Sequence, residues 1–166
     1  MVRTVSQSLR LLRRAGPEAQ DCHSFMDWLY KVHTDVWRRT THIPNESKSK
    51  IETLIKQLLG MKSGVSDFSI NHPVGQYHGC WLEMKAPGKT WSSVSDSQRE
   101  WLEEMGAAGF FPAVAYGYDH AVEIVTAYLR HPQPDLTRYR AGNAISVRRL
   151  RAGLEPSSNP HQLEAS

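Results

Sequence analysis

The chain of 166 residues lacks several features that define large classes of proteins. No apolar run approaches the roughly 18 residues that a membrane-spanning helix requires, so the sequence predicts no integral membrane protein. Two cysteines, Cys22 and Cys80, are too few for a disulfide framework or a zinc cluster. Because disulfides persist in oxidising compartments, we expect both thiols to be reduced, in a cytoplasm-like compartment.

Acidic side chains are absent from residues 1–16, which carry four arginines and lack the apolar segment of a secretory signal. Residues 17–130 hold 11 Lys and Arg against 14 Asp and Glu, and residues 131–166 hold five arginines against three acids. A slightly acidic body with arginine-rich ends suits a polyanionic partner, because the planar guanidinium pairs well with phosphate. Solvated tails explain the same pattern equally well.

Hydrophobic periodicity predicts alternating helices and strands between residues 17 and 130. Helical spacing, with Pro, Ser and Gly at the expected ends, predicts helices over 17–32, 47–59, 95–105 and 118–129. Runs of β-branched and aromatic residues predict strands over 36–43, 65–70, 79–85 and 111–115. The order α-β-α-β-β-α-β-α predicts one α/β domain, a mixed central sheet flanked by helices. We assign residues 1–16 to a basic N-terminal extension and 131–166 to a flexible, Arg-containing tail.

Three polar residues fall where two of these strands would meet. In the strand 79–85, side chains alternate between faces, so Glu83 and Lys85 point to the side opposite Leu82 and Met84. If the preceding strand pairs with it antiparallel, Asp67 reaches the same edge. Taken alone, a Glu-x-Lys pattern also fits an ordinary ion pair on an exposed strand.

Two carboxylates in one poorly solvated site repel each other unless one takes up a proton or a cation binds. Oxygen ligands favour a hard ion, Mg²⁺ or Mn²⁺, over zinc. Such an ion polarises a phosphoryl oxygen and helps to generate hydroxide, while Lys85 positions the water or stabilises developing negative charge. The cluster therefore predicts metal-assisted hydrolysis of a phosphodiester.

The motifs around this cluster resemble those of a known family. Asp67 with Glu83-Met84-Lys85 resembles the PD-(D/E)XK nuclease signature, and the surroundings resemble its VRR-NUC branch, the virus-type replication-repair nucleases. The matching segments are 42–45 (HIPN), 64–68 (GVSDF), 78–88 (HGCWLEMKAPG) and 97–102 (SQREWL). Ser66 stands where the signature has Pro, and Glu46-Ser47 stand where the family commonly has two glycines. The resemblance covers about residues 17–130 and implies that this segment is a VRR-NUC nuclease domain with a restriction-endonuclease-like fold.

The resemblance also implies a role for each matching residue. Asp67 and Glu83 are expected to hold a Mg²⁺ or Mn²⁺ ion, with the backbone carbonyl of Met84 as a further ligand. Lys85 is the expected catalytic lysine. Glu18, near the start of the first helix, matches a helix glutamate that reaches the metal, although an acid there also suits the helix dipole. Gln98 matches a glutamine expected to orient the metal ligands or the phosphate, and a surface glutamine is the alternative.

The expected activity is that of a metal-dependent deoxyribonuclease acting on branched, Holliday-junction-like DNA in replication, repair or recombination, as the family does. The family also implies a homodimer in the cytoplasm of a bacterial or phage-infected cell. Contacts with DNA are expected from Lys48, Lys50, Lys89 and Trp91, the last by stacking on a base. Two alternatives remain open: a flap, nick or restriction-type nuclease, and a non-catalytic nucleic-acid-binding module on a nuclease fold.

Overall fold

The computed structural model describes residues 14, 16–43 and 49–130. Predictions that concern other residues, namely most of the N-terminal extension, the arginine-containing tail and Lys48, lie outside the described residues. The helices are α2 (Pro17–Val32), α3 (Thr34–Trp37), α4 (Lys50–Leu58), α5 (Asp96–Ala107) and α6 (Tyr118–Leu129), with the 3₁₀ turn η1 (Trp91–Ser93). The strands are β1 (Thr40–His42), β2 (Phe68–Ile70), β3 (Cys80–Lys85) and β4 (Phe111–Tyr116).

The four strands form one mixed sheet in the order β1-β2-β3-β4. β1 pairs with β2 and β2 with β3 in antiparallel register, whereas β3 and β4 run parallel. The parallel pair is connected through α5, as a crossover between parallel strands requires. The predicted mixed α/β fold is therefore confirmed, including the antiparallel pairing of the two strands that carry the candidate site.

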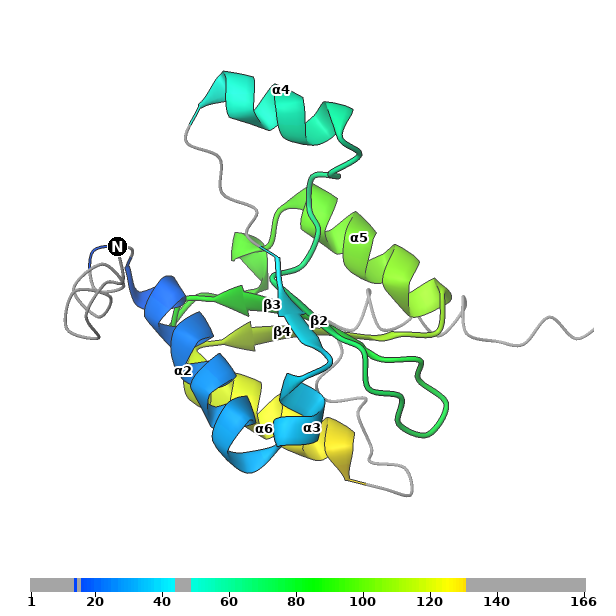
Figure 1. Ribbon diagram of the computed structural model, residues 1–166. Coiled ribbons are helices and arrows are strands. Elements are labelled where there is room, and N and C mark those ends of the chain that lie inside the picture. The colour runs from blue at the N-terminus through cyan, green and yellow to red at the C-terminus, as the bar shows by residue number, and fades with distance from the viewer. Residues whose placement is uncertain (1–13, 15, 44–48, 131–166) are drawn as a thin grey trace, which may run out of the picture.

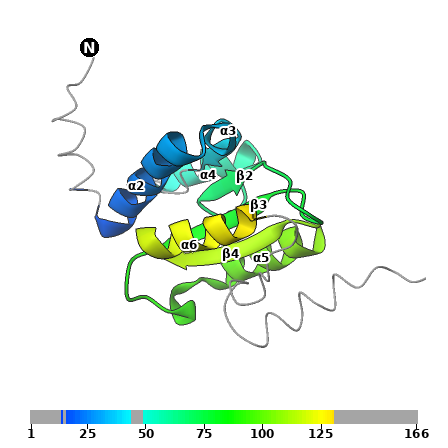
Figure 2. The ribbon, with the colours of Figure 1, turned by 90° about the horizontal axis from the view of Figure 1, so that it is seen from below.

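Helices cover both faces of the sheet (Figures 1 and 2). On one face, α2 and α6 bury Phe25, Leu29 and Tyr128 against the apolar side chains of β2, β3 and β4. On the other face, a smaller cluster joins Leu102 of α5 to Val114 of β4. The alternation along β3 sends Leu82 and Met84 into the larger core, which leaves Glu83 and Lys85 on the α5 side.

The first predicted strand, 36–43, is wrong at its start. Val36 and Trp37 belong to the helical turn α3, and only Thr40–His42 form β1. Val36 is buried in the core from the helical turn, and the Thr40 hydroxyl donates to its carbonyl oxygen. Tertiary packing of a β-branched residue thus overrides its strand propensity. Strand β2 likewise begins three residues later than predicted, at Phe68.

The second predicted helix is present as α4, but it begins later and its apolar stripe is not buried. Its N-cap is Ser49, whose hydroxyl accepts from the Glu52 amide, rather than Ser47. No residue of α4 is buried, and the helix stands apart from the sheet and the other helices (Figure 1). None of the described helices is long and apolar enough to cross a membrane.

Candidate active site

The candidate site lies where β2 and β3 meet the first turn of α5. Glu83 and Lys85 project from the same face of β3, and the Lys85 ammonium donates to Glu83 Oε1 at 2.8 Å. Glu83 is 1% exposed, so this carboxyl group is withdrawn from water within a polar cluster. The structure therefore brings together the two residues of the Glu-x-Lys motif as expected from strand alternation.

Asp67 reaches the same edge through the register of the antiparallel pair. Phe68 pairs with Leu82, so Asp67, one residue earlier, comes next to Glu83, one residue later. Directly opposed residues of an antiparallel pair share a face. Asp67 Oδ2 accepts a hydrogen bond of 2.8 Å from the amide of Met84, and the Asp67 carbonyl accepts from the amide of Ile43. These two bonds fix Asp67 beside the motif.

Gln98 is brought to Glu83 by the geometry of a helix start. Ser95 caps α5, and its hydroxyl accepts from the Gln98 amide while the Gln98 side-chain oxygen accepts from the Ser95 amide. This reciprocal capping box turns the Gln98 side-chain nitrogen toward the sheet. Gln98 Nε2 donates to Glu83 Oε1 at 2.5 Å, so the same oxygen accepts from both Gln98 and Lys85.

The environment of Glu83 disfavours the negatively charged form of its carboxyl group. The pKa of Glu83 is raised from 4.5 to about 7, chiefly by burial and also by the negative charges of Asp67 and Glu18, while Lys85 opposes the rise. Glu83 Oε2 is buried and has no hydrogen-bond partner among the described residues. One oxygen of this carboxylate is therefore saturated, and the other is available to a cation.

Glu18 lies close enough for its charge to act on the site. It stands exposed in the first turn of α2 and raises the pKa of both Glu83 and Cys22. The pKa of the Cys22 thiol is raised to about 12, chiefly by burial and in part by the charges of Asp67 and Glu18. Cys22 therefore stays protonated and is no nucleophile at neutral pH. Glu18 therefore adds a third negative charge to the neighbourhood of Asp67 and Glu83.

Across the described residues, no three His, Cys, Asp or Glu side chains are arranged as a complete metal-binding group. The donors present still fit a hard divalent ion that keeps several of its waters, as Mg²⁺ does. Asp67 and the unpaired Glu83 Oε2 supply carboxylate oxygens. The N–H of Met84 points to Asp67, and in a regular strand the carbonyl of a residue faces the same neighbour as its N–H. The Met84 carbonyl is thus directed to the Asp67 side, as the predicted ligand set requires.

The residues expected to contact DNA that the structure describes lie on three segments: α4, the loop after β3, and η1. Lys50 is exposed at the start of α4, and Lys89 is exposed in the loop after β3. Trp91 is half-buried in η1, where it packs on the cluster formed by Val94, Leu102 and Val114. The Arg99 guanidinium lies 5.3 Å from the centre of its ring. Stacking of a base on Trp91 stays a prediction that requires an uncovered ring face.

Two residues near the site were missed by the sequence argument. Gly64 adopts φ +82°, and a Cβ there would lie 2.2 Å from the backbone oxygen of Ser97. The loop before Asp67 therefore packs directly on the first turn of α5, which carries Gln98. Tyr116 of β4 pairs in register with Lys85, and burial raises the pKa of Tyr116. The position of Gly64 three residues before Asp67 could have indicated a close backbone contact. Nothing in the sequence pointed to Tyr116.

Comparisons with known proteins bear on the same region of the chain. The family model of the VRR-NUC domain matches residues 4–119. A solved structure named VRR_NUC domain protein is similar, with a TM-score of 0.62 and 22% identity over 73% of this chain and 94% of that chain. At this identity the likeness shows the fold. No curated protein matches the chain.

Proposed function

The chain belongs to the VRR-NUC family of PD-(D/E)XK nucleases, and from this premise we propose that it is a metal-dependent endonuclease that hydrolyses branched DNA inside the cell. The observation that supports this most directly is the convergence of Asp67, Glu83 and Lys85 at one end of the central strands β2 and β3, with Glu83 buried and one of its oxygens unpaired. A non-catalytic module has no need to keep such a strained set of charges.

The proposed metal ion is Mg²⁺ or Mn²⁺, held by Asp67, Glu83, the Met84 carbonyl and, through Glu18, the start of α2. When bound, such an ion neutralises the two carboxylates, polarises a phosphoryl oxygen and lowers the pKa of water. Family members of the PD-(D/E)XK type generally use divalent metals. The donor set of this chain, made of oxygens alone, matches that preference.

Lys85 and Gln98 have different proposed roles in hydrolysis. Lys85 places a positive charge beside the carboxylates, where it orients the attacking water and stabilises negative charge on the phosphate in the transition state. Gln98 holds Glu83 Oε1 and so keeps Oε2 directed away from Lys85. The water oxygen forms the new bond to phosphorus and gives up a proton to solvent. The bond between phosphorus and the sugar oxygen breaks, and the departing oxygen takes a proton from solvent.

Branched DNA is the proposed substrate by analogy with the family to which the chain belongs, and the sequence shows no base-reading motif. The chain therefore recognises shape and backbone rather than sequence. We also propose that the chain acts as a homodimer, because two-fold symmetry places two active sites on opposing strands of a junction.

The test is incubation of the purified chain with a labelled four-way junction, a flap, a nicked duplex and an intact duplex, with Mg²⁺, Mn²⁺ or EDTA. We expect cleavage of the junction with either metal and none with EDTA. Lys85→Ala should lower the cleavage rate by about 10²–10³-fold, the scale for removing one transition-state donor. Lys31→Ala is the matched control, since Lys31 makes only an exposed ion pair with Asp27 on α2. Cleavage that is equally fast in Lys85→Ala would refute the proposed site, and preference for the flap or the intact duplex would replace the proposed substrate.

A further inference from the structure

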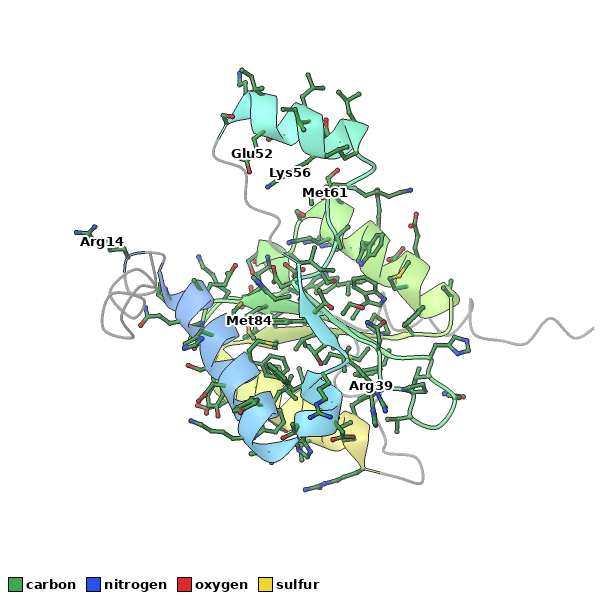
Figure 3. All side chains as sticks on the ribbon, viewed as in Figure 1. Arg14, Arg39, Glu52, Lys56, Met61 and Met84 are labelled. Atoms are coloured by element: carbon green, nitrogen blue, oxygen red, sulfur yellow. The ribbon has the colours of Figure 1, made fainter. Side chains whose placement is uncertain are left out.

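The last residues of β3 and β4 lie side by side at the candidate site. The two strands run parallel, and Tyr116 at the end of β4 pairs in register with Lys85 at the end of β3. In Figure 3, Met84 marks this end of β3. Paired residues of neighbouring strands project from the same face of a sheet. The Tyr116 side chain is therefore on the face that carries Lys85 and Glu83, the face covered by α5.

The phenol of Tyr116 lies within reach of the Lys85 charge. Burial raises the pKa of Tyr116, and the positive charge of Lys85 partly opposes the rise. The hydroxyl therefore keeps its proton at neutral pH and can donate it in a hydrogen bond. Within the described part of the chain, no protein group forms a hydrogen bond with this hydroxyl.

The ring of Tyr116 is held from two sides. The imidazole of His120, in the first turn of α6, stacks on it with 5.8 Å between the ring centres and 20° between the ring planes. Tyr116 also packs against the apolar cluster of Val94, Leu102 and Val114. The backbone amide of Tyr116, on the edge strand of the sheet, donates to His120 Nδ1 at 3.3 Å. A ring fixed in this way presents its hydroxyl in one place, as a preorganised donor requires.

We propose that the Tyr116 hydroxyl is a further catalytic group of the nuclease, which donates a hydrogen bond to an oxygen of the scissile phosphate beside Lys85. The inference rests on the proposed function, because it needs a phosphodiester bound next to Asp67 and Glu83. Lys85 supplies positive charge at this position, and Tyr116 supplies a directional donor. Tyr116 keeps its proton throughout, so the atoms and protons of the hydrolysis balance as before.

A phosphate oxygen suits this hydroxyl better than a nucleobase or the metal ion does. His120 stacks on the Tyr116 ring and the apolar cluster packs against it, so a base cannot stack there as it would on an exposed aromatic ring. A protonated phenol is also not among the oxygen ligands that hard divalent ions prefer. Its hydrogen-bond donor instead matches the anionic oxygens that the Lys85 ammonium attracts.

The first test is cleavage of the labelled four-way junction by Tyr116→Phe, which removes the hydroxyl and keeps the ring, its stacking and its packing. We expect the single-turnover rate at saturating protein to fall by about 10–100-fold, the range for one hydrogen bond to a charged group. The melting temperature and its shift with Mg²⁺ should stay as in the wild type. Tyr30→Phe is the matched control, since Tyr30 is 54% exposed on α2 and packs edge-on against Trp37. Cleavage by Tyr116→Phe at the wild-type rate overturns the inference.

The second test examines the contact itself with sulfur in the phosphate. The junction carries a phosphorothioate at the bond that the wild type cuts, prepared separately in each of the two configurations. Sulfur accepts hydrogen bonds more weakly than oxygen, so the loss caused by Tyr116→Phe should largely disappear in one configuration and persist in the other. A structural role of the hydroxyl would give the same loss with every substrate. An equal loss with oxygen and with both phosphorothioates overturns the contact.

His120 is expected to act as a positioning residue for this hydroxyl. His120→Ala removes both the stacked ring and the acceptor of the Tyr116 amide, so it should slow cleavage in the wild type. In the Tyr116→Phe background it should cause no further loss. The same loss in both backgrounds would overturn the positioning role.

This inference and the proposed function fail in different ways. A wild type that cuts none of the DNAs with Mg²⁺ or Mn²⁺ overturns the proposed function, and the role of Tyr116 with it. A wild type that cuts, together with an inactive Lys85→Ala and a fully active Tyr116→Phe, overturns the role of Tyr116 alone.

Discussion

Gln98 Nε2 donates its hydrogen bond to the Glu83 oxygen that also accepts from Lys85. The other end of the Gln98 amide is fixed, because its oxygen accepts from the Ser95 backbone amide at 3.0 Å. The helix cap of α5 and the orientation of the Glu83 carboxylate are therefore one hydrogen-bonded unit. The two hydrogen bonds therefore hold Gln98, a polar residue of a type usually found at the surface, in a defined position inside the candidate site.

The first prediction separates these two roles of Gln98. Gln98→Glu keeps an acceptor for the Ser95 amide, so the capping box and the helix remain. The substitution replaces the donor facing Glu83 with an oxygen and should lower both metal affinity and cleavage rate by about 10–100-fold, as expected for a group that orients a metal ligand. Metal titration and single-turnover cleavage measure the two effects.

The control for this prediction is Ser95→Ala. It removes the hydroxyl cap of α5 but leaves the Gln98 side chain, and should lower the free energy of unfolding by about 1 kcal/mol with a smaller effect on cleavage. If Ser95→Ala impairs cleavage as strongly as Gln98→Glu, Gln98 acts only through the helix.

Much of the candidate site follows from local rules in the sequence. Alternation along a strand places Glu83 and Lys85 on one face, and the antiparallel register adds Asp67. Ser95 predicts a helix start and so places Gln98 in the first turn of that helix, while its role at the site was implied only by the family resemblance. These arguments succeed because each depends on a spacing of a few residues or on one strand pairing.

What the sequence could not provide depends on how distant segments pack. Periodicity shows that α4 has an apolar face, but not that this face points away from the core. The sequence likewise did not show that Trp91 lies beside the Arg99 guanidinium. Val36 has the propensity of a strand residue and is held in the helical turn α3 by burial.

The second prediction concerns metal binding without reference to cleavage. Mg²⁺ or Mn²⁺ at a hundred times its dissociation constant should stabilise the wild type by about 2.7 kcal/mol, because it binds the folded state alone. Asp67→Asn and Glu83→Gln should abolish most of this shift. Glu52→Gln, which removes a carboxylate paired with Lys56 on α4, should retain it. Calorimetric melting with and without EDTA is the measurement, and an undiminished shift in Asp67→Asn places the ion elsewhere.

The third prediction tests the close contact at Gly64. A Cβ at this position would overlap the backbone of Ser97 and Gln98, with φ in the left-handed region as well. Gly64→Ala should therefore destabilise the protein by about 3 kcal/mol or more and reduce cleavage, since Asp67 and α5 must separate. Gly60→Ala is the matched control: Gly60 has φ +89° but nothing within 4 Å of the added Cβ. It should lose only about 1 kcal/mol, the penalty for the left-handed backbone. Equal losses in urea unfolding would show that Gly64 is needed for its dihedral angle alone.

The fourth prediction concerns the pH dependence of the metal-free protein. Burial and the charge of Asp67 raise the pKa of Glu83 to about 7 from 4.5. Between these values the folded state binds the proton more tightly than the unfolded state, so this group stabilises the fold at low pH and loses that contribution as the pH rises through about 7. The difference amounts to roughly 3 kcal/mol.

Glu83→Gln isolates this effect, because glutamine stays neutral and its oxygen still accepts from Lys85. In EDTA the variant should be more stable than the wild type at pH 8, and this advantage should vanish near pH 4.5. Subtracting the free energies of unfolding of the two proteins removes the contributions of the other titrating groups, which they share. With saturating Mg²⁺ the order at pH 8 should reverse, because only the wild type then gains the free energy of metal binding at Glu83. A constant difference across the pH range would show that Glu83 is ionised in the folded state throughout, and that Lys85 and Gln98 already balance its charge.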